Sequence, residues 1–74
     1  MKYIEYRKKL KEFNLSSGGF AKIIGLVETT PSAVWKRKGA IPIFAERFLE
    51  VLDKLPENER VVYIHHKLKE AEQQ

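Results

Sequence analysis

Hydrophobic side chains recur every three or four residues near the start of the chain, which is the spacing of one face of an α-helix. A first helix is predicted with an apolar face at Tyr3, Tyr6, Leu10 and Phe13, and Asn14 is expected to end it. A second, shorter helix follows, with a serine at its N-cap and a glycine after its last turn. Its cap is Ser16 or Ser17, its apolar positions are Phe20, Ala21, Ile23 and Ile24, and its stop is Gly25.

A third helix is predicted over residues 31–38. Thr30 as a cap and Pro31 at the first helical position form a start signal, because proline lacks only an N–H that would be unpaired there. Gly39 supplies the stop, and Val34 is expected to point into the core. The outward positions are then Ser32 and Lys36, and the flanking positions are Trp35, Arg37 and Lys38.

Two further amphipathic helices are predicted in the second half of the chain. The fourth begins after Ile41-Pro42 and runs to about Lys54, and the fifth covers about 57–72, although the segment RVVYI at 60–64 also favours a strand. The stripe on the fifth helix predicts either self-association or a cover for the open side of the other helices. The apolar stripes are Phe44, Phe48, Leu52 and Leu55 on the fourth helix, and Val61, Ile64, Leu68 and Ala71 on the fifth.

Length and composition favour one small all-α domain that covers residues 1–74. A chain of 74 residues buries only roughly 60% of its unfolded surface, so the core is small. The absence of cysteine excludes disulfides and thiolate metal sites, and no apolar run is long enough for a signal peptide or a membrane span. We therefore expect a cytoplasmic protein.

Charge is distributed unevenly along the chain. The formal net charge is +4, with nine basic and three acidic side chains in residues 1–38 and five basic and seven acidic side chains in residues 39–74. A positive half of this kind is expected in a protein that binds a polyanion. The ordinary alternative is a solvated surface, both for the cations at 7–11 and for those at 36–38, where cations also favour a helix C-terminus.

The order of short helix, glycine, turn and capped helix has a known counterpart. With its segments FAKIIGL, TPSAVWK and AIP, the chain resembles the Cro and repressor type helix-turn-helix proteins of bacteriophages and their bacterial relatives over roughly residues 17–55. The resemblance implies a five-helix DNA-binding domain, with a helix-turn-helix unit at about 17–38. The turn from Gly25 to Thr30 is longer than is usual in that family.

The resemblance also implies a set of DNA-binding residues. The helix 31–38 would lie in the major groove, and a dimer would read two half-sites. Base edges would be read by the outward residues, and phosphates would be bound by the flanking and turn residues. The base-edge candidates are Ser32, Trp35 and Lys36, and the phosphate candidates are Thr29, Thr30, Lys22, Arg37 and Lys38. For Trp35, burial in the core is the competing prediction.

Sequence-specific binding of double-stranded DNA by a small transcriptional regulator is therefore the predicted function. Two alternatives stay open: a helical protein-interaction module, such as an adaptor or antitoxin subunit, and a non-specific nucleic-acid-binding protein. No glycine-rich phosphate loop and no nucleophile with a base beside it indicate an enzyme. His65 and His66 diverge by about 100° on a helix, so neither a metal nor another cofactor is expected.

Overall fold

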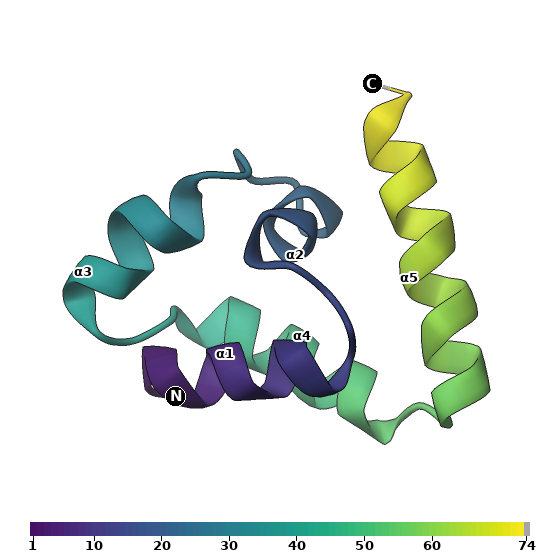
Figure 1. Cartoon of the computed structure of the whole chain (residues 1–74), viewed down its shortest axis with the longest axis horizontal. Helices are drawn as coiled ribbons and strands as arrows, with labels where there is room; N and C mark the ends of the chain where they lie inside the picture. Colours follow the sequence, from purple (N-terminus) through teal and green to yellow (C-terminus); the bar gives the residue numbers. More distant parts are fainter. Residues whose placement is uncertain (74) are drawn as a thin grey trace.

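The computed structural model describes residues 1–73 as a helical domain of 31 × 27 × 18 Å (Figure 1). The described residues contain no strand, only an isolated antiparallel bridge between Lys2 and Ala40, so the predicted all-α fold is confirmed. The third helix consists of a π-helical segment, η1, that continues without a break into α3. The segments are α1 (Tyr3–Glu12), α2 (Ser17–Ile23), η1 (Pro31–Trp35), α3 (Lys36–Lys38), α4 (Ile43–Lys54) and α5 (Glu57–Glu72).

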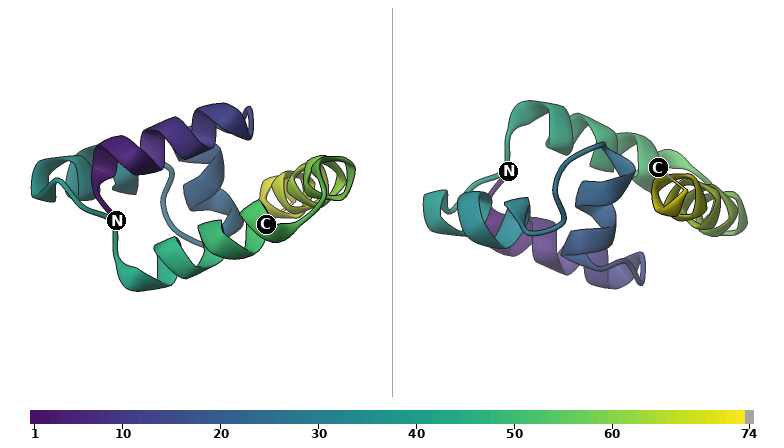
Figure 2. Two further views of the ribbon diagram at one scale, coloured as in Figure 1. Left: turned by 90° about the horizontal axis from the view of Figure 1, so that it is seen from below. Right: turned by 90° about the horizontal axis from the view of Figure 1, so that it is seen from above.

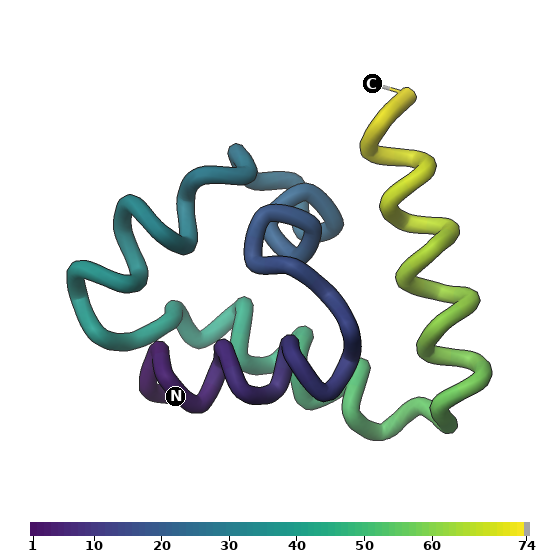
Figure 3. Tube along the Cα trace, in the orientation of Figure 1, coloured from purple at the N-terminus to yellow at the C-terminus, as the bar shows by residue number. Residues whose placement is uncertain are grey.

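The short helix α2 occupies the middle of the fold. Both views in Figure 2 show α2 between α1 and α4, with α3 at one end of the molecule and α5 at the other. The chain trace in Figure 3 passes from α2 through a loop into the helix 31–38 and returns beneath it to α4. This path leaves the helix 31–38 covered on one side only.

Aromatic rings form the centre of the core. The ring of Tyr6 lies edge-on to Phe20 and to Trp35, with centroid distances of 5.4 and 5.5 Å, and Phe48 contacts Phe20 at 5.8 Å. Such pairs stabilise a fold by about 0.5–1.5 kcal/mol each beyond the area that they bury. On α1, the predicted face is confirmed, since Tyr6, Leu10 and Phe13 are buried and Tyr3 packs half-buried against them.

The helix ends follow most of the predicted signals. The Ser16 hydroxyl accepts a hydrogen bond from the Gly19 N–H at 2.9 Å, which caps α2. Asn14 has a φ of 55°, Gly25 of 84° and Gly39 of 75°, so the three predicted stops all adopt left-handed backbone conformations.

Thr30 does not cap the third helix. Its own backbone is helical, with φ −54° and ψ −47°, and its side chain accepts no capping hydrogen bond. The first turn begins earlier, because the Ala33 N–H donates to the carbonyl of Thr29 at 2.9 Å. The predicted cap is therefore wrong, whereas Pro31 as the first residue of η1 is confirmed.

The buried face of α4 differs from the predicted stripe at one position, Phe44. Ala45, Leu49 and Leu52 are buried, whereas Phe44 is 53% exposed. The rest of the predicted stripe is confirmed, since Leu52 is buried and Phe48 and Leu55 pack half-buried against the core. The small side chain of Ala45 has no exposed surface, so the neighbouring elements approach α4 closely at that position. Phe44 lies on the outer side.

The last helix covers the core. Ile64 is buried, and Leu68 packs half-buried against the core, which supports the covering role for the predicted stripe, although Val61 is 57% exposed. The Arg60 guanidinium donates to the Leu55 carbonyl at 3.3 Å and lies 4.4 Å above the Phe13 ring centroid. These contacts fix the angle at which α5 leaves α4. None of the helices in residues 1–73 has the length and apolar character needed to cross a bilayer.

Candidate nucleic-acid interface

The helix 31–38 presents one apolar face to the core and the rest of its surface to solvent. Pro31 and Trp35 are buried, and Trp35 is only 4% exposed. Val34 is 42% exposed, so the prediction that it points inward is wrong. The indole is the larger apolar group, and it packs against two aromatic partners, Tyr6 and Phe20, that the shorter side chain of a valine would not reach.

Burial removes Trp35 from the base-edge candidates. Its ring lies beneath the helix, 5.5 Å from the Tyr6 centroid and 6.4 Å from the Phe20 centroid. The competing prediction, that Trp35 packs in the core, is confirmed. The indole therefore holds the helix on the body of the protein instead of facing a ligand.

The orientation set by Trp35 turns Arg37 away from the core. Two residues correspond to about 200° of rotation in a regular helix, so Arg37 points away from the side where Trp35 is buried. Its side chain is exposed, as is that of Lys36. Sequence reasoning assigned Arg37 to a flank because it oriented the helix by Val34. Orientation by the larger aromatic residue would have found the outward position.

Ser32 lies in the π-helical turn at the start of the helix 31–38. The Lys36 N–H donates to the carbonyl of Pro31, five residues back, which widens the turn relative to an α-helix. The Ser32 hydroxyl donates to the Thr29 carbonyl at 3.2 Å. Ser32 is exposed, as predicted. Because its hydroxyl proton is donated to Thr29, the hydroxyl can only accept hydrogen bonds from a ligand.

Three consecutive cations, Lys36, Arg37 and Lys38, form α3 and are exposed. Within residues 1–73, no carboxylate lies within 4.0 Å of any of them. Some cations of other helices are paired: Arg47 pairs with Glu50 at 3.3 Å, and Lys67 pairs with Glu70 at 3.1 Å. The positive charge of α3 is therefore available to an anionic ligand.

The remaining phosphate candidates lie in or beside the turn before the helix. Thr29 is exposed, and Thr30 is half-buried. Lys22, near the end of α2, forms an ion pair with Glu28 at 3.0 Å. This pair bridges α2 and the long turn, so Lys22 orders the turn in addition to lying near its surface.

Backbone hydrogen bonds hold the end of α3 in place. The Tyr3 N–H donates to the Gly39 carbonyl at 2.9 Å, and the Ile41 N–H donates to the Met1 carbonyl at 3.1 Å. The start of α1 is thereby tied to the chain that leaves α3. The backbone at this end of the helix is therefore already ordered, so the entropic cost of binding a ligand falls on the cationic side chains.

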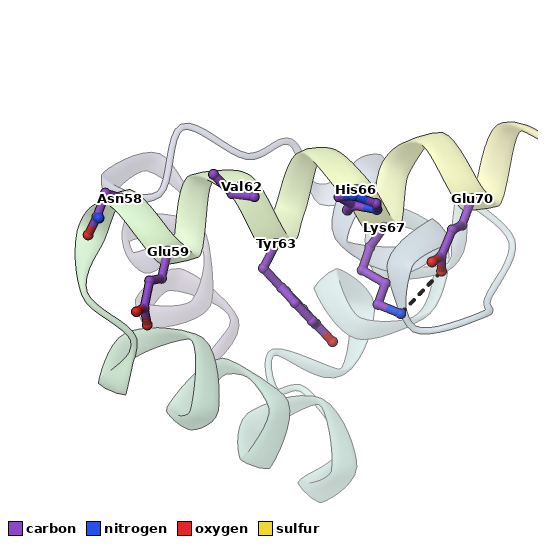
Figure 4. Close-up of a pocket in the computed structure, with 7 residues that line it drawn as sticks. All are labelled: Asn58, Glu59, Val62, Tyr63, His66, Lys67 and Glu70. Carbon is purple, nitrogen blue, oxygen red and sulfur yellow. Dashed lines mark hydrogen bonds and ion pairs between the residues drawn. The ribbon is translucent and has the colours of Figure 1, made fainter.

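A concave surface lies on α5 and differs in character from the cationic surface of α3. Its volume is about 550 Å³, and Figure 4 shows residues from successive turns of α5 along it. Val62 and Tyr63 provide apolar surface, Lys67 and Glu70 form an ion pair, and Glu59 adds a negative charge. Its charge does not suit a polyanion. We call this surface the α5 groove.

Comparison with known proteins gives no match: no family model fits the chain, and no curated protein or solved structure is significantly similar to it. The resemblance to helix-turn-helix proteins therefore remains a prediction from the sequence, and the geometry of residues 1–73 carries the functional argument.

Proposed function

We propose that the protein binds double-stranded DNA in a sequence-specific manner and acts as a small transcriptional regulator. The observation that carries this proposal is the exposed cationic surface of α3, which has no acidic partner within residues 1–73 and lies on a helix fixed to the core by Trp35. A helix held on one side and cationic on the other matches the requirements for insertion into the major groove. Its mechanism is binding and not catalysis.

Base recognition falls to the outward side of the helix. Arg37 takes the central position, where its guanidinium can donate two hydrogen bonds to the O6 and N7 acceptors of guanine. Lys36 lies beside it, and Ser32 adds an acceptor. One bidentate contact of this kind discriminates between bases by roughly 1–3 kcal/mol.

Phosphate binding falls to the edges of the same surface. Lys38, Thr29, Thr30 and Lys22 are assigned to the DNA backbone, where they set affinity and position and carry no sequence information. Each lysine that neutralises a phosphate releases a counterion, so the affinity is expected to fall steeply with salt.

Two copies on a two-fold site would supply the specificity that a module this small lacks. Exposed valines on α5 support a homodimer, because Val61 and Val62 are 57% and 62% exposed and Val62 lines the α5 groove. Sedimentation equilibrium of the wild type and of Val62→Glu tests this part of the proposal, and a monomeric wild type at 100-fold the DNA dissociation constant would refute it.

A salt titration of duplex binding tests the function itself. The proposed regulator retains a preference among duplex sequences at physiological salt. A non-specific protein would bind all duplexes equally, and a protein-interaction module would bind none of them above background. Exposed apolar residues near α3, namely Val34, Ile43 and Phe44, are what favours the module as the second candidate.

A further inference from the structure

A second basic surface lies between α1 and the start of α2. It is a hollow of about 590 Å³, and no acidic residue is among those that line it. We call it the α1 hollow. Its polar lining consists of Arg7, Lys8, Lys11, Asn14, Ser16 and Ser17.

Among the cations of α1, only Lys9 has acidic partners within residues 1–73. Lys9 points away from the hollow and pairs with Glu12 and Asp53, each at 3.3 Å, and these carboxylates raise the pKa of its ammonium above the ordinary value. Within residues 1–73, none of the three cations that line the hollow has a carboxylate within 4.0 Å. Neutralisation is thus confined to the cation outside the hollow.

One cation of the hollow is already oriented. The Arg7 Nη1 donates to the Ser17 hydroxyl at 3.3 Å, which links α1 to the first residue of α2. A guanidinium has five N–H donors, so most of them are available to a ligand. Its planar fork matches the oxygen spacing of a phosphate group, and Lys8 and Lys11 add point charges beside it.

The hollow belongs to the same helix that meets the end of α3. Lys2 forms the bridge with Ala40, and the Tyr3 N–H binds the Gly39 carbonyl. Along α1, positions 2 to 11 span roughly 14 Å at the helical rise, which is several phosphate steps of a DNA strand. The start of α1 therefore lies at the end of α3, and the hollow lies farther along the same helix.

We propose that the α1 hollow binds a backbone phosphate of the DNA duplex whose bases are read by the helix 31–38. The proposal rests on the proposed function and adds a second, sequence-independent contact to it. Arg7 and the two lysines hold the phosphate oxygens, and Ser17 positions the guanidinium.

The test compares two double variants that remove equal charge. Lys8→Gln with Lys11→Gln removes two cations of the hollow, and Lys54→Gln with Lys69→Gln removes two exposed cations of α4 and α5. Binding of a preferred and of a scrambled duplex is measured by fluorescence anisotropy across a series of salt concentrations. Both variants replace exposed side chains, and thermal melts followed by circular dichroism verify that both fold as the wild type does.

The hollow variant is expected to lower the slope of log K against log salt by roughly 0.9 for each phosphate that is no longer neutralised, on both duplexes alike. The control variant is expected to change the slope by less than half as much. Equal slopes for the two variants would overturn the proposal and leave the function of α3 intact. A wild type that binds neither duplex would refute the proposed function and this inference with it.

A titration with inorganic phosphate at constant ionic strength separates a DNA contact from a site for free phosphate. Amide resonances of Ser17 are expected to move with the duplex at concentrations where inorganic phosphate leaves them in place. Movement with inorganic phosphate together with unchanged duplex slopes would overturn the proposal.

Discussion

The indole of Trp35 packs edge-on against the ring of Tyr6, with 5.5 Å between the centroids and an interplanar angle of 78°. This contact joins the helix 31–38 to α1 and sets which side of the helix faces outward. The orientation of the proposed DNA-reading surface therefore depends on the packing of one aromatic pair.

Replacement of Trp35 is expected to destabilise the fold. Trp35→Ala removes a side chain that is 4% exposed, which typically costs about 3–5 kcal/mol, whereas Trp35→Phe retains a ring in the core and is expected to cost less than half as much. Urea unfolding followed by circular dichroism measures both values. A Trp35→Ala variant that unfolds like the wild type but binds DNA poorly would show that the indole faces the ligand.

Alkaline pH is expected to destabilise the protein through Tyr6. Burial raises the pKa of its hydroxyl from 10.0 to about 12. Above pH 10 the unfolded chain releases this proton while the folded chain retains it. The free energy of unfolding is therefore unaffected by Tyr6 below pH 10 and decreases between pH 10 and about pH 12. The decline is roughly 1.4 kcal/mol per pH unit.

Tyr6→Phe removes this pH dependence. The Tyr6 hydroxyl has no hydrogen-bond partner in the described structure, so its removal leaves no other polar group unpaired. We expect the variant to equal or exceed the wild type in stability at pH 7 and to lose less of it between pH 10 and 12. The half-buried Tyr63 provides the control substitution, Tyr63→Phe. An identical loss of stability between pH 10 and 12 in the wild type and in Tyr6→Phe would show that Tyr6 is not the group responsible.

Two glycines are expected to respond to alanine in opposite directions. Gly39→Ala places a Cβ in open space but at a φ of 75°, which costs roughly 1–2 kcal/mol. Gly18→Ala lies within α2, where a Cβ would meet Glu28 at an ordinary 3.5 Å, so it is expected to stabilise the helix by up to about 1 kcal/mol. Thermal unfolding of both variants compares the two effects. A lower unfolding midpoint temperature for Gly18→Ala than for the wild type would contradict the prediction that a Cβ fits at this position.

Local signals predicted where the helices begin and end better than they predicted which side of each helix is buried. Ser16, Gly25 and Gly39 act through backbone geometry within a few residues, and each ends or starts a helix as predicted. Val34 and Phe44 were misplaced because their burial depends on what packs from other elements, namely the aromatic rings around Trp35 and the close approach at Ala45.

The candidate site was predicted in part for the same reason. The segment and its cations follow from residue types, so Lys36 and Lys38 are where the sequence placed them, on the surface. The wide turn formed by the Lys36 N–H and the Pro31 carbonyl has no sequence signature, whereas the outward direction of Arg37 follows from the burial of Trp35. The α1 hollow could not be predicted from the sequence, because it depends on the position of the start of α2 relative to α1.

Selection of bound duplexes from a random pool tests whether the helix 31–38 reads DNA sequence. The pool is selected in parallel with the wild type, with Arg37→Ala and with Lys38→Ala at physiological salt. We predict that the wild type enriches a defined motif, that Lys38→Ala enriches the same motif with weaker binding, and that Arg37→Ala loses the preference at one or two base pairs. Identical motifs from all three proteins, or no enriched motif from the wild type, would contradict sequence recognition by this helix.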